Sequence, residues 1–257
     1  LIRTLADFDP GLDLALTTNG SLLARHAPAL ADAGLDRVTV SFHSLDDTTA
    51  RQLSGVDAPL SAVLDGLATA KRAGLGPIKL NVVAMRDGNA SEIVDLARFG
   101  RDHGYVLRFI EYMDVGTVNG WDPAAVLSAR EIVERIDAVY PLEPVGRSHR
   151  GEVAERYRYV DGGGEIGVIP SITQPFCGDC TRVRLSAEGK LYTCLFAQIG
   201  HDLKTPLRAG DDDAALAARI RAIWRARTDR YSEERTAALR DGTFSAIPKV
   251  EMFRIGG

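Results

Sequence analysis

The sequence predicts an α/β protein with a parallel sheet, and three observations carry this prediction. Short apolar stretches alternate along the first half of the chain with longer stretches whose apolar residues recur at helical spacing. Two of the helical stretches close on a glycine, Gly34 and Gly74, as helices often do. Strands joined by helices of this length lie parallel, in a sheet that is either open or curled toward a barrel.

Each element is predicted from its own stretch of residues. An apolar run that ends in turn residues indicates a strand, and apolar residues spaced by three and four indicate a helix. In the first half, strands are expected within residues 12–20, 37–47, 78–85 and 106–115, and helices within 1–8, 21–35, 59–75 and 90–104.

The second half follows a different pattern, in which two stretches alternate around turns as antiparallel hairpins do. One more helix, the two hairpins and a last amphipathic helix are expected within residues 129–142, 152–171, 181–195 and 211–231. We therefore expect two domains, residues 1–140 and a smaller, antiparallel domain of residues 141–257.

Polar side chains share one face of each of the first three predicted strands. Thr17 lies on the first such face, Ser41 and His43 on the second, and Lys79 and Asn81 on the third. In a barrel these faces line the interior, and active sites form at the carboxyl ends of the strands. A solvated sheet face would show the same alternation, so a single position leaves both interpretations open. For His43 we favour a hydrogen-bonded structural histidine.

Composition and charge exclude several classes of protein. With 31 Lys plus Arg against 35 Asp plus Glu, the chain carries a net charge of −4, so we expect neither nucleic acid nor a membrane as a partner. No stretch approaches the about 18 apolar residues of a membrane span, and residues 1–10 lack the apolar run of a secretory signal. The expectation is a cytoplasmic protein.

All three cysteines lie in one short stretch, where Cys177 and Cys180 form a C-x2-C pair and a hairpin turn folds Cys194 back toward them. An odd number excludes a full set of internal disulfides, so the spacing indicates a metal centre. A zinc site would need a fourth ligand, which His201 could supply. A 4Fe-4S cluster tolerates three thiolates and leaves one iron open. Spacing leaves zinc and iron–sulfur open, with inert buried cysteines as a third alternative.

Two arginines accompany these cysteines. Arg182 and Arg184 stand two apart on a predicted strand, so their side chains share a face. Paired guanidinium groups bind phosphate or triphosphate through bidentate, charge-assisted hydrogen bonds. This favours an iron–sulfur centre beside an anionic substrate, although a solvated strand would also accept two arginines.

Five motifs together resemble the family of GTP 3′,8-cyclase, also called molybdenum cofactor biosynthesis protein A. They are LTTNG from Leu16, DRVTVSFHSLDD from Asp36, IKLNVV from Ile78, LRFIEYMDVGTVNGW from Leu107 and FCGDCTRVRLSAEGKLYTCLF from Phe176. DRYSEERT from Asp229 and the terminal Gly256 and Gly257 extend the resemblance to essentially the whole chain. The cysteine–arginine motif is highly specific, whereas TTNG alone is weak.

This resemblance implies a radical S-adenosylmethionine enzyme with an incomplete TIM-type (βα) barrel and a C-terminal, antiparallel, cysteine-rich iron–sulfur domain. It also implies that the open iron of the C-terminal 4Fe-4S cluster takes the purine of GTP. The implied site residues are Cys177, Cys180 and Cys194 for the cluster, Thr17, Lys79, Arg108, Arg182 and Arg184 for GTP, and Ser41 and Met113 for S-adenosylmethionine. No catalytic residue is assigned.

The implied reaction begins when an N-terminal cluster cleaves S-adenosylmethionine to a 5′-deoxyadenosyl radical, which removes the hydrogen from C3′ of GTP. The carbon radical closes on C8 of guanine and gives 3′,8-cyclo-7,8-dihydro-GTP, which a separate pterin synthase would rearrange. Such a reaction depends on holding C3′ and the triphosphate still, which explains several cationic anchors around one ligand. The resemblance also implies a homodimer.

The sequence departs from the family at its start. In the family, the C-x3-C-x2-C motif of the first cluster and a GGEP segment for S-adenosylmethionine precede the point that corresponds to Leu1. We expect both, and the second 4Fe-4S cluster, upstream of these residues, and we expect the isolated chain to be inactive. A smaller departure is SFHSLDD, where the family more often has Leu-Asp-Ala after the residue that corresponds to Ser41.

Two other classes share part of this pattern. A different radical S-adenosylmethionine enzyme with an auxiliary cluster would carry the same repeats and cysteines but would not need Arg182 and Arg184. A non-enzymatic, zinc-bound interaction module would need a fourth ligand such as His201. A GTP-dependent cluster spectrum and the metal content of His201→Ala separate these classes from the cyclase.

Overall fold

The computed structural model describes residues 1–245 and 247–255. The described chain divides into two compact units. The first consists of Leu1–Tyr112, Ala124–Arg147 and Ala154–Pro170, and the second of Met113–Pro123, Ser148–Val153 and Ser171–Gly257. The first unit thus extends well past residue 140. The terminal Gly256 and Gly257 of the family resemblance lie outside the described residues.

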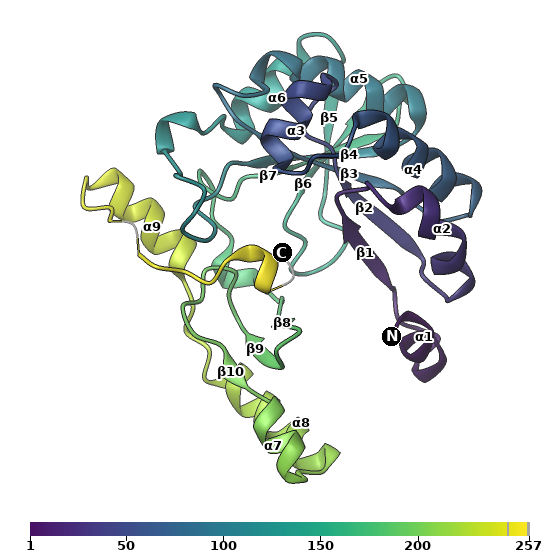
Figure 1. Ribbon diagram of the computed structural model, residues 1–257. Coiled ribbons are helices and arrows are strands. Elements are labelled where there is room, and N and C mark those ends of the chain that lie inside the picture. Colours follow the sequence, from purple (N-terminus) through teal and green to yellow (C-terminus); the bar gives the residue numbers. More distant parts are fainter. Residues whose placement is uncertain (246, 256–257) are drawn as a thin grey trace. The chain divides into compact units, whose positions relative to one another are not determined.

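Within the described residues, the first unit is built on a seven-stranded sheet (Figure 1) with the order β1-β2-β3-β4-β7-β6-β5. Its strands are β1 Ala15–Thr18, β2 Arg37–Ser41, β3 Lys79–Ala84, β4 Val106–Glu111, β5 Leu142–Val145, β6 Glu155–Tyr159 and β7 Glu165–Ile169. The first four strands and β7 pair in parallel, whereas β6 pairs antiparallel with both β7 and β5. The mainly parallel sheet and the hairpin at 152–171 are therefore confirmed, and the hairpin joins the large sheet.

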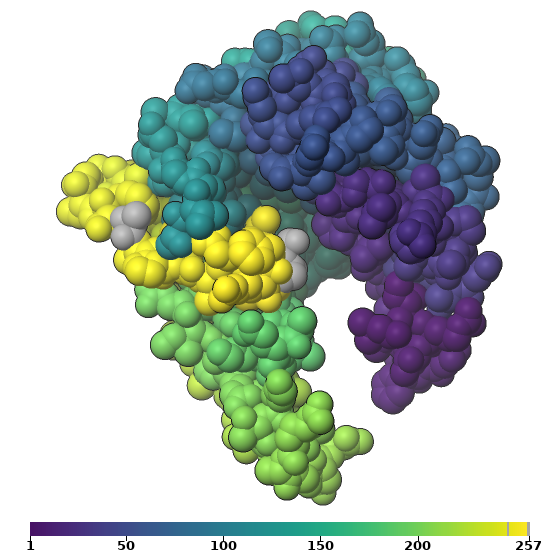
Figure 2. Space-filling model, in the orientation of Figure 1, coloured from purple at the N-terminus to yellow at the C-terminus, as the bar shows by residue number. Residues whose placement is uncertain are grey.

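Helices connect the parallel strands, as predicted. The helices of the first unit are α1 Ile2–Phe8, α2 Leu23–Asp32, α3 Asp47–Ser54, α4 Leu60–Arg72, α5 Ile93–His103 and α6 Ala129–Asp137, with short 3-10 turns at η1 Ala90–Glu92 and η2 Pro123–Ala125. Helix α3 was not predicted from the sequence, because its side chains are all exposed or half-buried and so give no apolar periodicity. Figure 2 shows α1, in dark purple, protruding from the first unit with its side chains exposed or half-buried.

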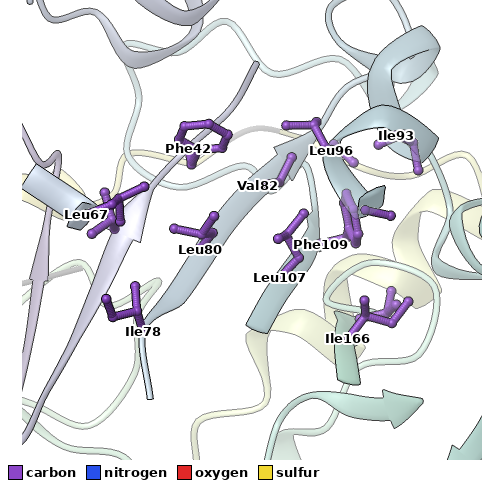
Figure 3. Packing of buried hydrophobic residues seen from close by; sticks show 14 of the residues in the cluster. Phe42, Leu67, Ile78, Leu80, Val82, Ile93, Leu96, Leu107, Phe109 and Ile166 are labelled. Carbon is purple, nitrogen blue, oxygen red and sulfur yellow. The ribbon is translucent and has the colours of Figure 1, made fainter. Parts of the chain in front are cut away.

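The core of the first unit lies between one face of the sheet and the helices. Figure 3 shows Leu80, Leu107 and Phe109 of the central strands packed with Ile93 and Leu96 of α5, and all five are 0% exposed. Fully burying one such side chain contributes about 1.5–3 kcal/mol. Because strand side chains alternate in direction, burial of this face leaves the opposite face of β1–β4 for polar residues.

The turn after β1 requires a glycine. Gly20 has a φ of +83°, a conformation that other residues adopt rarely. A Cβ at this position would also lie 2.9 Å from side-chain atoms of both Val40 and Val63. The predicted strand–turn–helix unit therefore depends on the glycine of the TTNG motif for both its dihedral angle and its packing.

The second unit contains, in its described part, a three-stranded antiparallel sheet with the order β10-β9-β8. Its elements are η3 Cys177–Asp179, β8 Arg184–Leu185, β9 Lys190–Tyr192, β10 His201–Asp202, α7 Lys204–Ala209, α8 Asp213–Arg225, α9 Tyr231–Arg240 and η4 Met252–Arg254. The predicted hairpin and the helix at 211–231 are confirmed, and the Asp212 side chain caps α8 by accepting from the Ala215 N–H at 2.8 Å. Across the described residues, every helix is too short or too polar to span a membrane.

Candidate functional site

The polar face of the parallel sheet carries several of the predicted ligand residues. Thr17 on β1, Thr39 on β2 and Lys79 on β3 are paired across the sheet in one row. Paired residues of parallel strands point to the same side, so the predicted GTP ligands Thr17 and Lys79 share this face. Thr17 is exposed and Lys79 is half-buried, so both are accessible to a ligand.

A second row lies closer to the carboxyl ends of the strands. It pairs Ser41 of β2 with Asn81 of β3, and Asn81 with Arg108 of β4. Ser41 and Arg108 are both half-buried. The structure therefore places four predicted ligand residues, one from each of four strands, on one polar face of the sheet. The alternation in the sequence predicts this position for Thr17, Ser41 and Lys79.

Arg108 is held in a defined position on this face. Its Nε donates to Asn81 Oδ1 at 2.9 Å, and its Nη2 donates to Thr39 Oγ1 at 3.4 Å. A Cβ at Gly167 on the neighbouring β7 would lie 3.3 Å from Arg108 Cγ, so the glycine makes room for the arginine. Burial, with a smaller effect from Arg37, lowers the pKa of Arg108, but an arginine keeps its charge in proteins. Arg108 is thus a fixed cation.

The end of β2 borders a cavity of about 30 Å³ that is lined in part by Asn19, Ser41 and His43. The backbone N–H of Val83 donates to His43 Nδ1 at 3.2 Å. Burial lowers the pKa of His43 to about 4. The prediction that His43 is hydrogen-bonded is therefore confirmed.

Asn89 holds the segments that follow β2 and β3 together. Its Nδ2 donates to the carbonyl oxygens of His43 at 2.7 Å and Val83 at 2.9 Å, and its Oδ1 accepts from the Met85 N–H at 2.9 Å. Asn89 is 0% exposed. This role of Asn89 was not predicted from the sequence, because an asparagine after a strand is typical of an ordinary turn.

The three cysteines all lie in the second unit and are half-buried free thiols. Cys177 and Cys180 bracket the η3 turn, in which the Cys180 N–H donates to the Cys177 carbonyl at 3.2 Å. Cys194 follows β9, and its Sγ accepts from the Phe196 N–H at 3.4 Å. Burial is the main cause that raises the pKa of Cys194, and the negative charge of Asp229 raises this pKa further.

Arg182 lies directly against one of these thiols. Its Nε and Nη2 each lie 3.3 Å from Cys180 Sγ, and its guanidinium stacks 5.1 Å from the Phe176 ring centre. Burial by itself would raise the pKa of Cys180, but the N–H and charge of Arg182 outweigh it and lower that pKa. Burial, followed by the charge of Arg182, lowers the pKa of Arg184, whose charge also interacts with Cys180 and Cys194.

This donor set suits an iron–sulfur cluster. Three soft thiols with two cations beside them match a cluster whose thiolate ligands carry negative charge. In the part of the chain that the structure describes, no three His, Cys, Asp or Glu side chains are arranged closely enough to hold a single metal ion. His201 is exposed on β10. The cysteine ligand set therefore stays a prediction, supported by the chemistry of its surroundings.

Met113, the other predicted S-adenosylmethionine ligand, is half-buried and precedes a buried ion network in the second unit. Asp114 accepts hydrogen bonds from Arg235 at 2.6 Å, from Lys249 at 2.7 Å and from the Tyr231 hydroxyl. The side chains of Arg235, Lys249 and Asp114 are 0%, 2% and 4% exposed. This network was not predicted from the sequence, because its members are far apart in the chain.

Comparison with known proteins agrees with the motifs. Residues 105–233 match the family model described as Molybdenum Cofactor Synthesis C, and residues 1–100 match the Radical SAM superfamily. A protein named GTP 3′,8-cyclase from Acidothermus cellulolyticus is 51% identical over 278 aligned positions, which cover 100% of this chain and 76% of that protein. Proteins of the same name from Xanthomonas campestris pv. campestris (strain B100) and Parasynechococcus marenigrum are 48% and 46% identical. They align with 100% and 95% of this chain and with 74% and 71% of their own lengths. The chain belongs to the GTP 3′,8-cyclase family of radical S-adenosylmethionine enzymes.

Proposed function

We propose that this protein is the GTP 3′,8-cyclase of molybdenum cofactor biosynthesis and converts GTP to 3′,8-cyclo-7,8-dihydro-GTP. The observation that carries the proposal is the contact of Arg182 with Cys180, which couples an anion-binding group to a predicted cluster ligand. Family membership supports the reaction, and it implies that 4Fe-4S clusters and S-adenosylmethionine are the cofactors.

The predicted residues take the following roles in this proposal. Cys177, Cys180 and Cys194 hold one 4Fe-4S cluster, and Ser41 and Met113 bind S-adenosylmethionine. When bound, S-adenosylmethionine and a second cluster supply the radical chemistry, and the open iron of the first cluster supplies a site for the purine.

The cationic side chains bind and orient GTP. Arg182 and Arg184 offer paired guanidinium groups to the phosphates, and Lys79 offers a point charge with three donors. Arg108 is already immobilised by Asn81, so little side-chain entropy is lost when it binds an anion. The neutral hydroxyl of Thr17 adds a hydrogen bond without charge. Several anchors on one ligand restrict its motion, which is how an enzyme brings two reacting carbons together.

Finer features belong to the same proposal. The parallel sheet is the incomplete barrel of a radical S-adenosylmethionine core, and the cysteine-rich second unit is the iron–sulfur and GTP-binding domain, near the predicted division into residues 1–140 and 141–257. We also propose a cytoplasmic homodimer whose product is rearranged by a pterin synthase. The resemblance of the motifs supports each of these features.

Metal analysis and GTP binding test the proposed function together. After anaerobic reconstitution, we expect about four irons and matching sulfide for the cluster on these three cysteines, and a visible spectrum that changes when GTP is added. Zinc without sulfide, with metal content that depends on His201, would make the cyclase proposal wrong.

Arg182→Ala tests the phosphate role. We expect this variant to keep its iron and to bind GTP about tenfold or more weakly, because a charge-assisted hydrogen bond is lost. Calorimetric titration with GTP measures the change, and Arg130→Ala, which removes an arginine from an exposed ion pair on α6, is the matched control. Unchanged GTP affinity would refute the role of Arg182.

A further inference from the structure

His43 has no role in the proposed function, yet it lies beside a residue that does. It follows Ser41, the last residue of β2, by two positions, and both residues line the cavity of about 30 Å³ at the end of that strand. A cavity needs about 10–15 Å³ of such volume to hold a water molecule, so this one accommodates a single small polar group or one or two waters.

The hydrogen bond to Val83 determines which ring nitrogen of His43 carries the proton. A backbone N–H can only donate, so Nδ1, which receives it at 3.2 Å, is the unprotonated acceptor. The proton of the neutral ring therefore lies on Nε2. Since burial lowers the pKa of His43 to about 4, this single tautomer persists through the neutral pH range. Nε2–H is then a hydrogen-bond donor and never an acceptor.

This donor is accessible and without a partner. In residues 1–245 and 247–255, the one side-chain nitrogen or oxygen that is both fully buried and without a hydrogen bond is Arg235 Nε. His43 Nε2, which also lacks a hydrogen bond, is therefore not fully buried. Within the same residues neither His43 Nε2 nor the Ser41 hydroxyl has a hydrogen-bond partner. Two polar groups that border one small cavity are thus available for a ligand or a water.

The surrounding contacts hold His43 in place. Asn89 binds the His43 carbonyl at 2.7 Å, and the adjacent Ser44 hydroxyl donates to the Glu92 carboxylate at 2.7 Å. Glu92 also accepts from the Leu45 N–H at 2.8 Å. A donor that is held from both its ring and its backbone is oriented before a ligand arrives, which reduces the entropy lost on binding.

We propose that His43 Nε2–H and the Ser41 hydroxyl together bind one acceptor atom of S-adenosylmethionine, directly or through one bridging water. This inference rests on the proposed function, which assigns Ser41 to that cofactor. A neutral donor suits the ligand, because it can bind an oxygen or nitrogen acceptor without adding a positive charge near the cationic sulfonium.

Two substitutions separate the binding role of His43 from its structural role. His43→Asn keeps an acceptor near the position of Nδ1 and removes the Nε2–H donor. His43→Gln places an amide N–H near the position of Nε2 and removes the acceptor for Val83. We expect His43→Asn to melt like the wild type but to bind S-adenosylmethionine about tenfold more weakly, as loss of one hydrogen bond at a partly buried site predicts. We expect His43→Gln to melt at a lower temperature and to lose less affinity than His43→Asn.

The measurement is calorimetric titration of the full-length, reconstituted protein with S-adenosylmethionine and, separately, with GTP. GTP affinity should stay unchanged in both variants. Wild-type affinity for S-adenosylmethionine in His43→Asn, with a lower melting temperature in His43→Gln, would overturn the inference and leave His43 a purely structural residue. If the wild type bound neither ligand, the proposed function itself would fail, so the two failures are distinguishable.

Discussion

Charge balance around single residues organises the interior of the second unit. The carboxylate of Asp114 forms ion pairs with two buried cations, Arg235 and Lys249, and accepts a hydrogen bond from the phenol of Tyr231. Burial by itself would raise the pKa of Asp114, but the hydrogen bonds from Lys249 and Tyr231 and the charge of Arg235 hold it below its ordinary value. Arg235 also lies 5.3 Å from the centre of the Phe196 ring, and the Phe196 N–H donates to Cys194 Sγ. The network therefore supports the backbone next to a predicted cluster ligand.

Asp114→Asn tests this charge balance. The substitution leaves Arg235 and Lys249 buried without their counter-charge, so we expect the free energy of unfolding to fall by about 3–5 kcal/mol. Urea unfolding followed by tryptophan fluorescence measures it, since both tryptophans, Trp121 and Trp224, belong to the second unit. Glu134→Gln, which breaks an exposed ion pair with Arg130, is the control and should change stability by less than about 0.5 kcal/mol. An equally small effect of Asp114→Asn would contradict the argument.

His43 makes stability depend on pH. Its pKa is about 4 in the folded protein against an ordinary value of 6.5. Above the ordinary value the ring is neutral in both states and contributes no pH dependence. As the pH falls toward 4, the unfolded chain takes up a proton that the folded protein excludes. We expect the wild type to lose about 3 kcal/mol over this window relative to His43→Asn. Parallel stability profiles of the two proteins between these pH values would show that His43 does not titrate in this way.

At the scale of secondary-structure elements, two side chains join the end of β3 to the segment that follows β2, beyond the last backbone hydrogen bond between them, from the Phe42 N–H to the Asn81 carbonyl. The Val83 N–H is taken by the His43 ring, and Asn89 satisfies the carbonyl oxygens of both His43 and Val83. Parallel strands that diverge at their carboxyl ends open space for a ligand there, and their freed backbone groups still need partners. Asn89 provides these partners next to the Ser41 row.

Asn89→Ala should weaken this junction. The substitution leaves backbone groups of His43, Val83 and Met85 without a partner in the interior, so we expect stability to fall by at least about 1–3 kcal/mol. Thermal unfolding monitored by circular dichroism measures the loss. Arg98→Ala, which removes an exposed pair with Asp95 on α5, is the control. A melting temperature equal to that of the control would mean that water replaces Asn89 without cost.

At the scale of the whole molecule, the chain consists of two compact units that each carry their own polar network. The Asn89 network lies entirely in the first unit, and the Asp114 network lies entirely in the second. The chain as a whole carries a net charge of −4, so the attraction for an anionic ligand depends on the local placement of the predicted cationic GTP ligands. Each unit can therefore be perturbed through its own network.

Hydrogen exchange should reveal this division. We expect Asn89→Ala to accelerate amide exchange in β2 and β3, and Asp114→Asn to accelerate exchange in residues 113–123 and in α9, because local opening follows the contacts that are lost. Mass spectrometry of peptides from each variant gives the measurement. If either substitution accelerated amide exchange in both units, the two units would unfold together.

Local patterns were enough to predict much of this protein. The four parallel strands and their connecting helices follow from apolar periodicity, because alternation along a strand and spacing along a helix are properties of the backbone itself. The same alternation placed Thr17, Ser41 and Lys79 on one polar face, as the register confirms. The cysteine–arginine motif indicated the family, which the family models and relatives confirm. Arg108 entered through the resemblance alone.

Only the tertiary structure decided how distant segments meet. The hairpin of β6 and β7 joins the parallel sheet through pairing of β4 with β7, so the first unit reaches past residue 140. Asn89 binds the carbonyl of His43 across 46 residues, and Lys249 binds Asp114 across 135 residues. A hydrogen bond between residues so far apart leaves no period in the sequence, because its partners become neighbours only after the chain has folded.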